Sequence, residues 1–432
     1  MTPNSQGAIV VLGAMFGARY PELMPAAARR GLAVLGIDAR SPFKERFDEA
    51  RRTHRDHPLA PIVELAWCDG DSHEDVLEQV VAWQARYDIR AVLAFGEDFV
   101  TAAALVADFL GLPSPGLRAS RVCRDKLLQR RYLADWSPRS LFIPPTARRE
   151  RAATWDVFPA VLKPTGRNAS SGVVRIDDRA QLLAALDDYD EGEPLLVERL
   201  VSGHEVSVEA LSQDGRVIFA SVTGKRTTES CGQFFVEMGH SAPDPDIPEA
   251  TRAAVLEANR AILARLQFAS GISHAEFRIA PDGEVCLMEI AARAAGDSIV
   301  TLYHLATGTP MEEAMLAVAL GEPATYPQPR RFARQVYLRH EPGVLRGVRV
   351  DGLPAQVTWL PDRWMWPPVT PVSGDGALHM VVSGRAAGAE LDEIRQSGDR
   401  SLMYVIDAPT IAALDALEAR CDAAISLDIE AA

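Results

Sequence analysis

The sequence predicts an α/β protein made of two or three domains. In residues 1–118, apolar runs at 8–12 and 32–37 alternate with stretches of helical pattern, which is typical of a doubly wound parallel sheet. Further along, the Asp-Gly pairs at 214–215 and 282–283 each separate two β-rich segments, which predicts antiparallel hairpins. A chain of 432 residues also exceeds the length that one hydrophobic core usually supports.

The composition is that of an ordinary globular protein, with 47% hydrophobic and 24% charged residues. The net charge of -14 argues against nucleic acid or an anionic membrane surface as the main partner. No apolar run approaches the roughly 18 residues needed to span a bilayer, and the first residues do not resemble a secretory signal. Five cysteines without CxxC spacing indicate free thiols in a reducing compartment. We therefore expect a cytoplasmic protein.

The first domain, residues 1–118, is expected to position substrate. The run at 8–12 is apolar throughout and ends at Gly13, as in a strand buried on both faces. After it we expect a helix over 25–30, a strand over 32–37, a helix over 75–87, a strand over 91–95 and a helix over 98–110. Ligands of such sheets bind at the carboxyl ends of the strands, which points to the Gly13 turn, Asp38 and residues 96–98. The Gly13 turn lacks GxGxxG spacing, so a substrate scaffold is favoured over NAD binding.

The next segments combine lysines with a loop of small residues. Residues 112–130 run from a Pro-rich turn into a helix that carries Lys126, and a strand over 158–163 ends at Lys163. The loop that follows, TGRNASSGV, contains Ser170, Ser171 and Gly172. Small residues leave backbone N–H groups free to surround phosphates, although the loop lacks the Walker A order. Taken alone, a surface turn explains this loop equally well.

A connector between two predicted lobes follows at residues 194–211. An apolar strand leads to Glu198 and Leu200, and from Glu205 the residues alternate between polar and apolar. A connector with exposed backbone groups and a carboxylate at each end can hold an adenine edge and ribose hydroxyls. Glutamates on a solvated sheet face would produce the same pattern.

The segment 274–293, HAEFRIAPDGEVCLMEIAAR, predicts a pair of opposed carboxylates. If Asp282-Gly283 forms a two-residue turn, Glu276 lies directly opposite Glu289. Two carboxylates about 5 Å apart repel each other unless a cation lies between them, and ligands that are all oxygen suit Mg²⁺. Arg293, four residues beyond Glu289, is suited to a phosphate held by that metal. The alternative is a solvated hairpin with two exposed glutamates.

The last segment, residues 326–432, predicts a small α+β lobe that closes over the site. Its composition becomes richer in Arg, Pro and Trp, with strands expected at 380–383 and 402–406 and a helix at 410–425. Trp359, Trp364 and Trp366 are close together in the sequence and are interpreted as packing residues.

Several motifs together resemble the ATP-grasp superfamily over roughly residues 120 to 325. They occur in the order RDK, VLKP, the small-residue loop, VERLVSGHEVSVEA, SHAEFR and LMEIAAR. The segments FVEMGHSAP and MEIAARAAGD are similar to carboxylate–amine ligases of the L-amino acid ligase type. The resemblance implies an ATP-grasp fold, with ATP-grasp lobes at 119–325 between the α/β domain and the closing lobe.

The resemblance also implies roles for individual residues. For the nucleotide, it implies that Lys126 and Lys163 contact the phosphates and that the loop with Ser170, Ser171 and Gly172 closes over them. It also implies that Glu198 and Leu200 lie along the adenine and that Glu205 binds the ribose. For the chemistry, it implies that Glu276 and Glu289 bind Mg²⁺, with Mn²⁺ as a substitute. It also implies that Arg293 neutralises the transferred phosphate and the acyl intermediate, and that His240 faces the substrate pocket. Many ATP-grasp enzymes have Asn as a further metal ligand where this chain has Ala291, which leaves the number of metal ions open.

The expected function is that of an ATP-dependent carboxylate–amine ligase. It would form an amide or dipeptide bond through an acyl phosphate and release ADP and phosphate. The expected partners are a small carboxylate and a small amine, with amino acids as the first candidates; a homodimer remains open. Two alternatives are a non-catalytic ATP-binding regulatory protein and a biotin-dependent carboxylase subunit.

Overall fold

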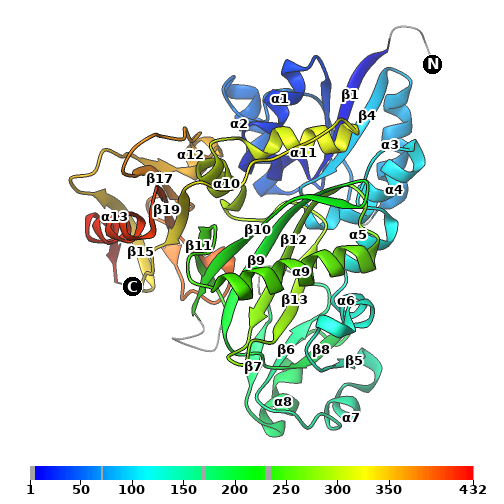
Figure 1. Cartoon of the computed structure of the whole chain (residues 1–432), viewed down its shortest axis with the longest axis vertical. Helices are drawn as coiled ribbons and strands as arrows, with labels where there is room; N and C mark the ends of the chain where they lie inside the picture. Colours follow the sequence, from blue (N-terminus) through cyan, green and yellow to red (C-terminus); the bar gives the residue numbers. More distant parts are fainter. Residues whose placement is uncertain (1–4, 70–71, 168–170, 229–234, 432) are drawn as a thin grey trace.

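In the computed structural model, which describes residues 5–69, 72–167, 171–228 and 235–431, four β-sheets are surrounded by helices (Figure 1). Among the described residues, Cys68, Cys123, Cys286 and Cys421 are free thiols, as predicted, and Cys231 lies outside the described residues. Within the same part of the chain, no helix has the length and apolar character required to cross a bilayer.

The N-terminal sheet is parallel, with strand order β3-β2-β1-β4, and helices cover both faces. Its strands are β1 (Gln6–Leu12), β2 (Ala33–Asp38), β3 (Ile62–Trp67) and β4 (Tyr87–Ala94), and its helices are α1 (Leu23–Arg29), α2 (Pro42–Thr53), α3 (His73–Gln84) and α4 (Val100–Leu110). On β1, Ile9 and Val11 pack with the α1 side, while Ala8 and Val10 pack with the α3 and α4 side. This confirms the doubly wound arrangement.

The sequence pattern of this domain did not predict two of its elements and misplaced one boundary. Strand β3 lies at the edge of the sheet and carries partly exposed residues, so it has no continuous apolar run. Helix α2 was also not predicted. Strand β4 starts at Tyr87, where the helical pattern predicted the end of a helix.

The helix predicted to carry Lys126 is two short helices, α5 (Leu117–Cys123) and α6 (Lys126–Tyr132). The side chain of Asp125 accepts hydrogen bonds from the backbone N–H groups of Leu127 and Leu128. This N-cap begins a new helix and fixes Lys126 at its first position.

A small antiparallel lobe follows, seen at the bottom of Figure 1, with strand order β5-β8-β6-β7. Its elements are β5 (Ser140–Ile143), α7 (Arg148–Ala152), β6 (Ala160–Pro164), β7 (Val174–Ile176), α8 (Arg179–Ala185) and β8 (Leu195–Arg199). Because β6 and β8 are neighbours, Lys163 and Glu198 lie on adjacent strands.

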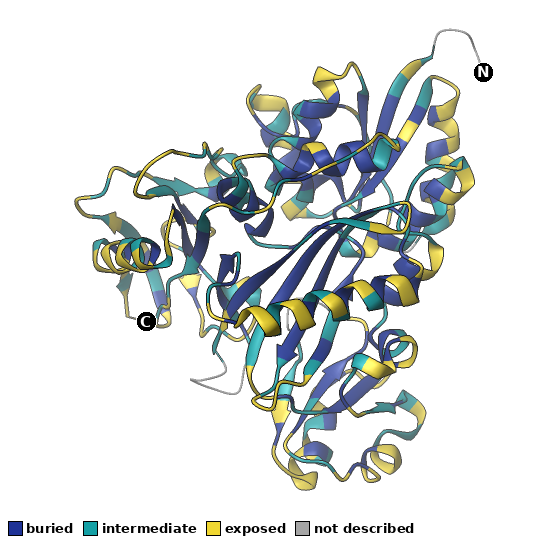
Figure 2. Cartoon of the chain, viewed as in Figure 1, coloured by how far each residue is buried: buried dark blue, intermediate teal, exposed yellow. Residues whose placement is uncertain are grey.

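The largest sheet has strand order β13-β12-β9-β10-β11-β14-β19-β17-β16. Its strands are β9 (His204–Gln213), β10 (Arg216–Thr227), β11 (Glu237–Ala242), β12 (Gly271–Ile279), β13 (Val285–Ala291), β14 (Phe332–Tyr337), β16 (Val357–Trp359), β17 (Ala377–Ser383) and β19 (Leu402–Ala408). Helix α9 (Glu249–Leu266) covers the sheet with exposed residues outward and buried strands behind it (Figure 2). Pairing of β11 with β14 carries the sheet across the expected domain boundary near residue 325.

The hairpin β12–β13 places Glu276 opposite Glu289, as predicted, but the turn is not the predicted one. The backbone N–H of Ala280 donates to the C=O of Glu284, and Ile279 pairs with Val285. The loop is therefore one residue longer than a two-residue turn. A register shift between Glu276 and Phe277 skips Met288 and restores the opposed pair.

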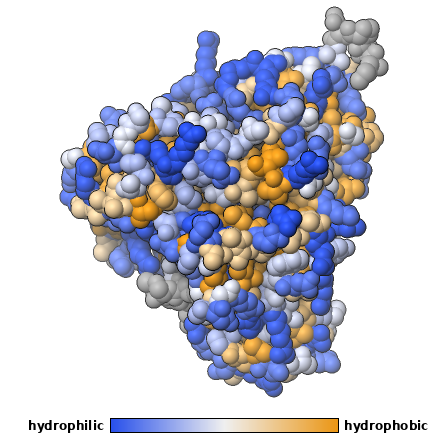
Figure 3. Space-filling view, viewed as in Figure 1, coloured by the Kyte–Doolittle hydropathy of each residue, from blue (hydrophilic) through white to orange (hydrophobic). Residues whose placement is uncertain are grey.

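The C-terminal residues extend the large sheet and add a three-stranded sheet with order β18-β15-β20. The remaining elements are α10 (Ile299–Thr307), α11 (Met311–Leu320), β15 (Gly343–Val350), α12 (Leu360–Arg363), β18 (Glu390–Leu391), α13 (Ile411–Ala424) and β20 (Ile425–Glu430). Trp364 packs on Phe47 of α2 with ring centroids 5.2 Å apart, which agrees with the predicted packing role. On the face in Figure 3, hydrophilic residues dominate the periphery and hydrophobic residues gather near the middle, around α9.

Candidate active site

A cavity of about 540 Å³ lies where the N-terminal domain, the small lobe, the large sheet and the C-terminal residues meet. The predicted site residues that line it are Lys126, Lys163, Ser171, Glu198, Leu200, Glu205, His240, Glu276, Glu289 and Arg293. Gly172 follows Ser171 in a left-handed conformation with φ of 70°, and Ser170 lies outside the described residues. Residues separated by up to 167 positions therefore share one cavity.

Both predicted phosphate-binding lysines are buried and held by carboxylates. Lys126 Nζ lies 3.0 Å from Glu289 Oε1 and donates to the backbone oxygen of Arg167 at 2.6 Å. Lys163 Nζ lies 2.7 Å from Glu198 Oε2. These contacts fix the direction of both ammonium groups.

The carboxylate of Glu198 forms ion pairs with two cations of the protein. Arg130 Nε lies 2.5 Å from Glu198 Oε1, opposite the contact with Lys163. Burial raises the pKa of Glu198, but the charges of Arg130 and Lys163 outweigh burial and lower it to about 2. The side chain is therefore occupied, and a contact of Glu198 with adenine would have to use its backbone.

The connector after β8 offers a residue that the sequence pattern did not single out. The backbone N–H of Leu200 is taken by the C=O of Pro159 at 3.1 Å. Val201 is buried and also lines the cavity, and its C=O accepts a hydrogen bond from Arg278 at 3.0 Å. Arg278 donates to Glu205 at 2.7 Å, which orients the carboxylate predicted to bind ribose. The local sequence does not distinguish Leu200 from Val201 as the backbone contact for adenine. Only the fold shows that the backbone N–H of Leu200 is already hydrogen-bonded to Pro159.

The opposed glutamates lie beside a buried lysine. Lys225 Nζ lies 2.6 Å from Glu276 Oε1, 2.5 Å from Glu237 Oε1 and 3.6 Å from Glu205 Oε1. Burial lowers the pKa of Lys225, but the three carboxylates raise it well above its usual value. Lys225 is therefore a cation at the centre of the site.

Glu276 is oriented by a buried histidine. His274 Nε2 lies 3.1 Å from Glu276 Oε1, and His274 Nδ1 lies 3.0 Å from both oxygens of Glu209. Burial lowers the pKa of His274, but Glu209 and Glu276 raise it to about 10. Metal-binding carboxylates are commonly oriented by such hydrogen-bonded partners. Two opposed oxygen ligands, one of them oriented in this way, fit a hard divalent ion such as Mg²⁺.

Arg293 connects the nucleotide side of the cavity to the N-terminal domain. Its guanidinium forms an ion pair with Glu97, and Arg293 NH1 donates to the backbone oxygen of Ala294 at 2.8 Å. Of the strand ends predicted to contact substrate, Glu97 and Asp98 line the cavity. Asp38 does not line it: its carboxylate is buried, 2.6 Å from Lys44 Nζ and 2.7 Å from the backbone nitrogen of Met15.

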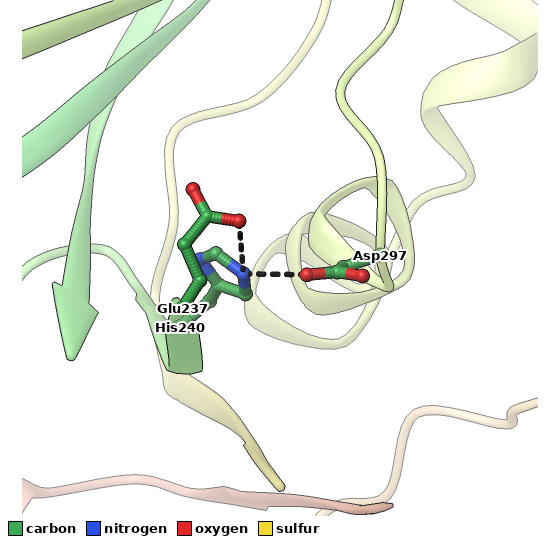
Figure 4. Close-up of side chains that lie close together, drawn as sticks. All are labelled: Glu237, His240 and Asp297. Carbon is green, nitrogen blue, oxygen red and sulfur yellow. Dashed lines mark hydrogen bonds and ion pairs between the residues drawn. The ribbon is translucent and has the colours of Figure 1, made fainter. Parts of the chain in front are cut away.

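His240 belongs to a cluster with two carboxylates (Figure 4). His240 Nε2 lies 2.9 Å from Asp297 Oδ2 and 3.9 Å from Glu237 Oε2. Arg400 donates to both oxygens of Asp297, at 2.8 and 2.9 Å. Lys225 also pairs with Glu237 at 2.5 Å. The cluster holds the imidazole in one orientation. Nothing in the local sequence around Arg400 predicted its contact with Asp297.

Residues 156–302 match the family model of the ATP-grasp domain. The chain contains an ATP-grasp domain. The solved L-amino acid ligase from Bacillus licheniformis superposes with a TM-score of 0.74 at 18% identity, covering 99% of this chain and 100% of that one. Phosphoribosylglycinamide synthetase from Anaerococcus prevotii superposes with a TM-score of 0.68 at 13% identity, covering 98% and 100%. The predicted fold class is therefore confirmed, with an ATP-grasp domain at residues 156–302 and a fold shared with these solved structures over nearly all of the chain.

The curated relatives that the chain resembles are ligases and a synthase. Alanine–anticapsin ligase from Bacillus subtilis (strain 168) is 25% identical over 301 residues, which is 61% of each chain. D-alanine–D-alanine ligase A from Chromobacterium violaceum is 27% identical over 196 residues, 40% of this chain and 51% of that one. The arginine-specific carbamoyl phosphate synthase large chain from Bacillus subtilis is 28% identical over 158 residues, 36% of this chain and 14% of that one. The chain thus spans about three fifths or less of the length of these relatives.

Proposed function

We propose that the protein is an ATP-dependent carboxylate–amine ligase that acts on small molecules, with amino acids as the first candidates. The observation that carries the proposal is one cavity in which buried lysines, two opposed glutamates and Arg293 converge. The names of the relatives, alanine–anticapsin ligase and D-alanine–D-alanine ligase, support the same reaction class.

In this proposal the nucleotide occupies the side of the cavity next to the small lobe. Lys126 and Lys163 bind phosphate oxygens, and the loop residues Ser171 and Gly172 lie over them. The adenine lies along the connector at Leu200 and Val201, and Glu205 binds the ribose. Glu276 and Glu289 hold Mg²⁺ or Mn²⁺, which supplies charge neutralisation at the phosphates when bound.

The first step transfers the γ-phosphoryl group. A carboxylate oxygen of the acid substrate attacks the γ-phosphorus, an O–P bond forms, and the bond to the β–γ bridging oxygen breaks, so that ADP leaves with that oxygen. Arg293 and Lys225 neutralise the negative charge that collects on the transferred group. The product is an acyl phosphate, which has to be kept from water until the amine attacks.

The second step forms the amide. The amine nitrogen attacks the acyl carbon, and the bond from that carbon to the phosphate oxygen breaks. Of the two protons that the ammonium form loses, one goes to solvent and the other leaves with phosphate, while Asp297 holds the ring of His240 through Nε2. Arg293 stabilises the oxyanion of the tetrahedral intermediate.

Two alternative functions differ in the reactants required for ADP release. The ligase releases ADP only when both a carboxylate and an amine are present. A regulatory protein binds ATP without releasing ADP, and a biotin-dependent carboxylase requires bicarbonate and biotin. A pairwise screen of amino acids and small carboxylates for phosphate release, with detection of the amide by mass, distinguishes the three.

We predict that Glu289→Ala and Arg293→Ala each lower turnover by about 100- to 1000-fold or more, because each removes charge stabilisation at the transferred phosphate. Phosphate release is measured for each variant with the active substrate pair, and circular dichroism checks that the fold is intact. The matched control is Glu284→Gln, a half-exposed glutamate of the same hairpin that does not line the cavity. Unchanged turnover in either active-site variant would contradict the assignment.

A further inference from the structure

Two neighbouring strands of the large sheet bring four polar side chains to one face. Glu209 of β9 stands directly opposite His274 of β12. Two positions along the same strands, Ser207 stands opposite Glu276. Residues two positions apart on a strand point to the same side, so all four side chains share one face of the sheet. His274 and Glu276 line the cavity, whereas Glu209 does not.

Glu209 uses both of its carboxylate oxygens on partners inside the protein. Its side chain is 2% exposed, and the hydroxyl of Ser207 donates to its Oε1 at 2.8 Å. His274 Nδ1 lies 3.0 Å from each of the two oxygens. An ionised carboxylate only accepts hydrogen bonds, so the Nδ1–H of His274 donates to Glu209. This contact fixes the orientation of the imidazole ring.

The other ring nitrogen of His274 points at Glu276. His274 Nε2 lies 3.1 Å from Glu276 Oε1, and Lys225 Nζ lies 2.6 Å from the same oxygen. The second oxygen, Oε2, accepts no hydrogen bond from any residue in the described part of the chain. Two donors therefore hold Oε1 of Glu276, and Oε2 is the oxygen available to a cation.

A buried ion pair such as Glu209 with His274 gives little net stability. The cost of removing both charges from water offsets most of their attraction, and apolar residues in place of such a pair are often as stable or more stable. The polar contacts of Glu209 within the described residues are those with Ser207 and His274. Glu209 therefore acts on the cavity through the ring of His274.

We propose that Glu209 is a positioning residue for the divalent ion, because it holds the ring of His274 and the ring holds the carboxylate of Glu276. This inference rests on the proposed function, in which Glu276 and Glu289 bind the metal ion. A hydrogen-bonded partner behind a metal ligand raises the affinity for the ion, since the ligand is already oriented before the ion binds. Glu209 itself contacts neither the ion nor the nucleotide.

The test measures metal affinity separately from turnover. Binding of Mn²⁺ to the wild type and to Glu209→Gln is followed by electron paramagnetic resonance, with less ADP than protein so that little free nucleotide competes for the ion. We expect the dissociation constant for Mn²⁺ to rise by about 10- to 100-fold in the variant, the range for replaced partners of metal ligands. ADP binding in the presence of EDTA should stay the same, because Lys126, Lys163 and Glu205 are left in place.

Turnover supplies a second measurement of the same effect. The Mg²⁺ concentration that gives half of the maximal rate should rise in Glu209→Gln by the same factor as the dissociation constant for Mn²⁺. The kcat at saturating Mg²⁺ should fall much less, because a high concentration of the ion compensates for an imperfectly oriented ligand.

The matched control is Asp407→Asn. Asp407 is also a fully buried carboxylate next to an imidazole, 2.8 Å from His379 Nε2, but neither residue lines the cavity. Loss of this pair should lower the free energy of unfolding and leave the dissociation constant for Mn²⁺ unchanged.

A double-mutant cycle shows whether Glu209 acts through His274. If the ring is the link, Glu209→Gln weakens Mn²⁺ binding far less in a His274→Gln background than in the wild type. Equal effects in both backgrounds would overturn the proposed link. The double variant removes both members of the ion pair, so neither is left as an unpaired buried charge. Where a single variant does not fold, wild-type affinity for Mn²⁺ in the double variant overturns the proposal.

The outcomes separate this inference from the proposed function. A wild type that binds no Mn²⁺ in the presence of ADP contradicts the metal site of the proposed function itself. Equal dissociation constants for the wild type and a folded Glu209→Gln variant overturn the role of Glu209 and leave the ligase function in place. A loss of affinity in Asp407→Asn as large as in Glu209→Gln also overturns that role, since it would reflect a general loosening of the fold.

Discussion

At the residue scale, Glu312 is a buried acid with an incomplete set of partners. Its side chain is 3% exposed, and its Oε2 atom has no hydrogen-bond partner among the described residues. Burial, together with the nearby charges of Glu22 and Glu313, raises its pKa from 4.5 to about 7. The folded state therefore holds this proton more tightly than the unfolded chain. The contribution to stability is complete below pH 4.5 and is lost as the pH rises to about 7.

We predict that Glu312→Gln removes this pH dependence. Relative to the wild type, the free energy of unfolding of the variant should improve by up to about 3 kcal/mol between pH 4.5 and 8, because a shift of one pKa unit corresponds to about 1.4 kcal/mol. Urea unfolding of both proteins at pH 4.5, 6 and 8 measures the difference. Glu249→Gln is the control, since Glu249 is an exposed acid on helix α9 and is not among the charges that act on Glu312. A difference that is constant over this pH range would contradict the prediction.

At the element scale, the turn between the connector and β9 depends on Gly203. Its φ is 124°, and a Cβ at this position would lie 2.0 Å from the backbone oxygen of Ile279 on β12. Only glycine avoids both the backbone strain and the contact with Ile279. The turn joins Val201 to Glu205, so it sets how the adenine and ribose ends of the proposed nucleotide site are spaced.

We predict that Gly203→Ala lowers the free energy of unfolding by at least about 2 kcal/mol and weakens ATP binding, because β9 must move away from β12. Gly215→Ala is the control: Gly215 also has positive φ, 77°, but a Cβ added there would have no atom within 4 Å, so a cost of about 1 kcal/mol is expected. Urea unfolding and calorimetric titration with ATP measure the two effects. Equal losses in the two variants would show that the approach to Ile279 is unimportant.

At the scale of the whole molecule, Arg400 connects the C-terminal residues to the site. Its guanidinium binds both oxygens of Asp297, donates to the backbone oxygen of Glu237 at 2.9 Å and lies 3.9 Å from the ring centre of Tyr337. Burial raises the pKa of Asp297, but the charge of Arg400 outweighs this and keeps it well below its usual value. The C-terminal residues therefore orient His240 through Asp297.

We predict that Arg400→Met lowers the free energy of unfolding by about 3–5 kcal/mol, because Asp297 is left as a buried charge without its main partner. Turnover should fall as well, because His240 loses its orientation. Arg395→Met is the matched control, since Arg395 belongs to an exposed ion pair with Glu393 in a neighbouring loop. Chemical unfolding and phosphate release are measured for both variants, and a loss no larger than that of the control would contradict the role of Arg400.

Features that depend on local pattern could be predicted from the amino-acid order alone. Continuous apolar runs identified the buried parallel strands, since both faces of such strands must exclude water. The hairpin of β12 and β13 was predicted with the right partners, because Glu276 and Glu289 stand opposite each other. That success depended on two deviations that cancel, the longer turn and the bulge at Met288, neither of which the alternation of residues reveals.

Only the tertiary structure decided which charges meet. Glu198 is held by Arg130 and Lys163, and Asp297 by Arg400, 103 positions away. Ion pairs between distant segments produce no periodic pattern in the sequence. The sequence therefore does not show which carboxylate an arginine binds in the folded chain. Local hydrogen bonding and burial fix the elements, whereas long-range electrostatics choose the partners.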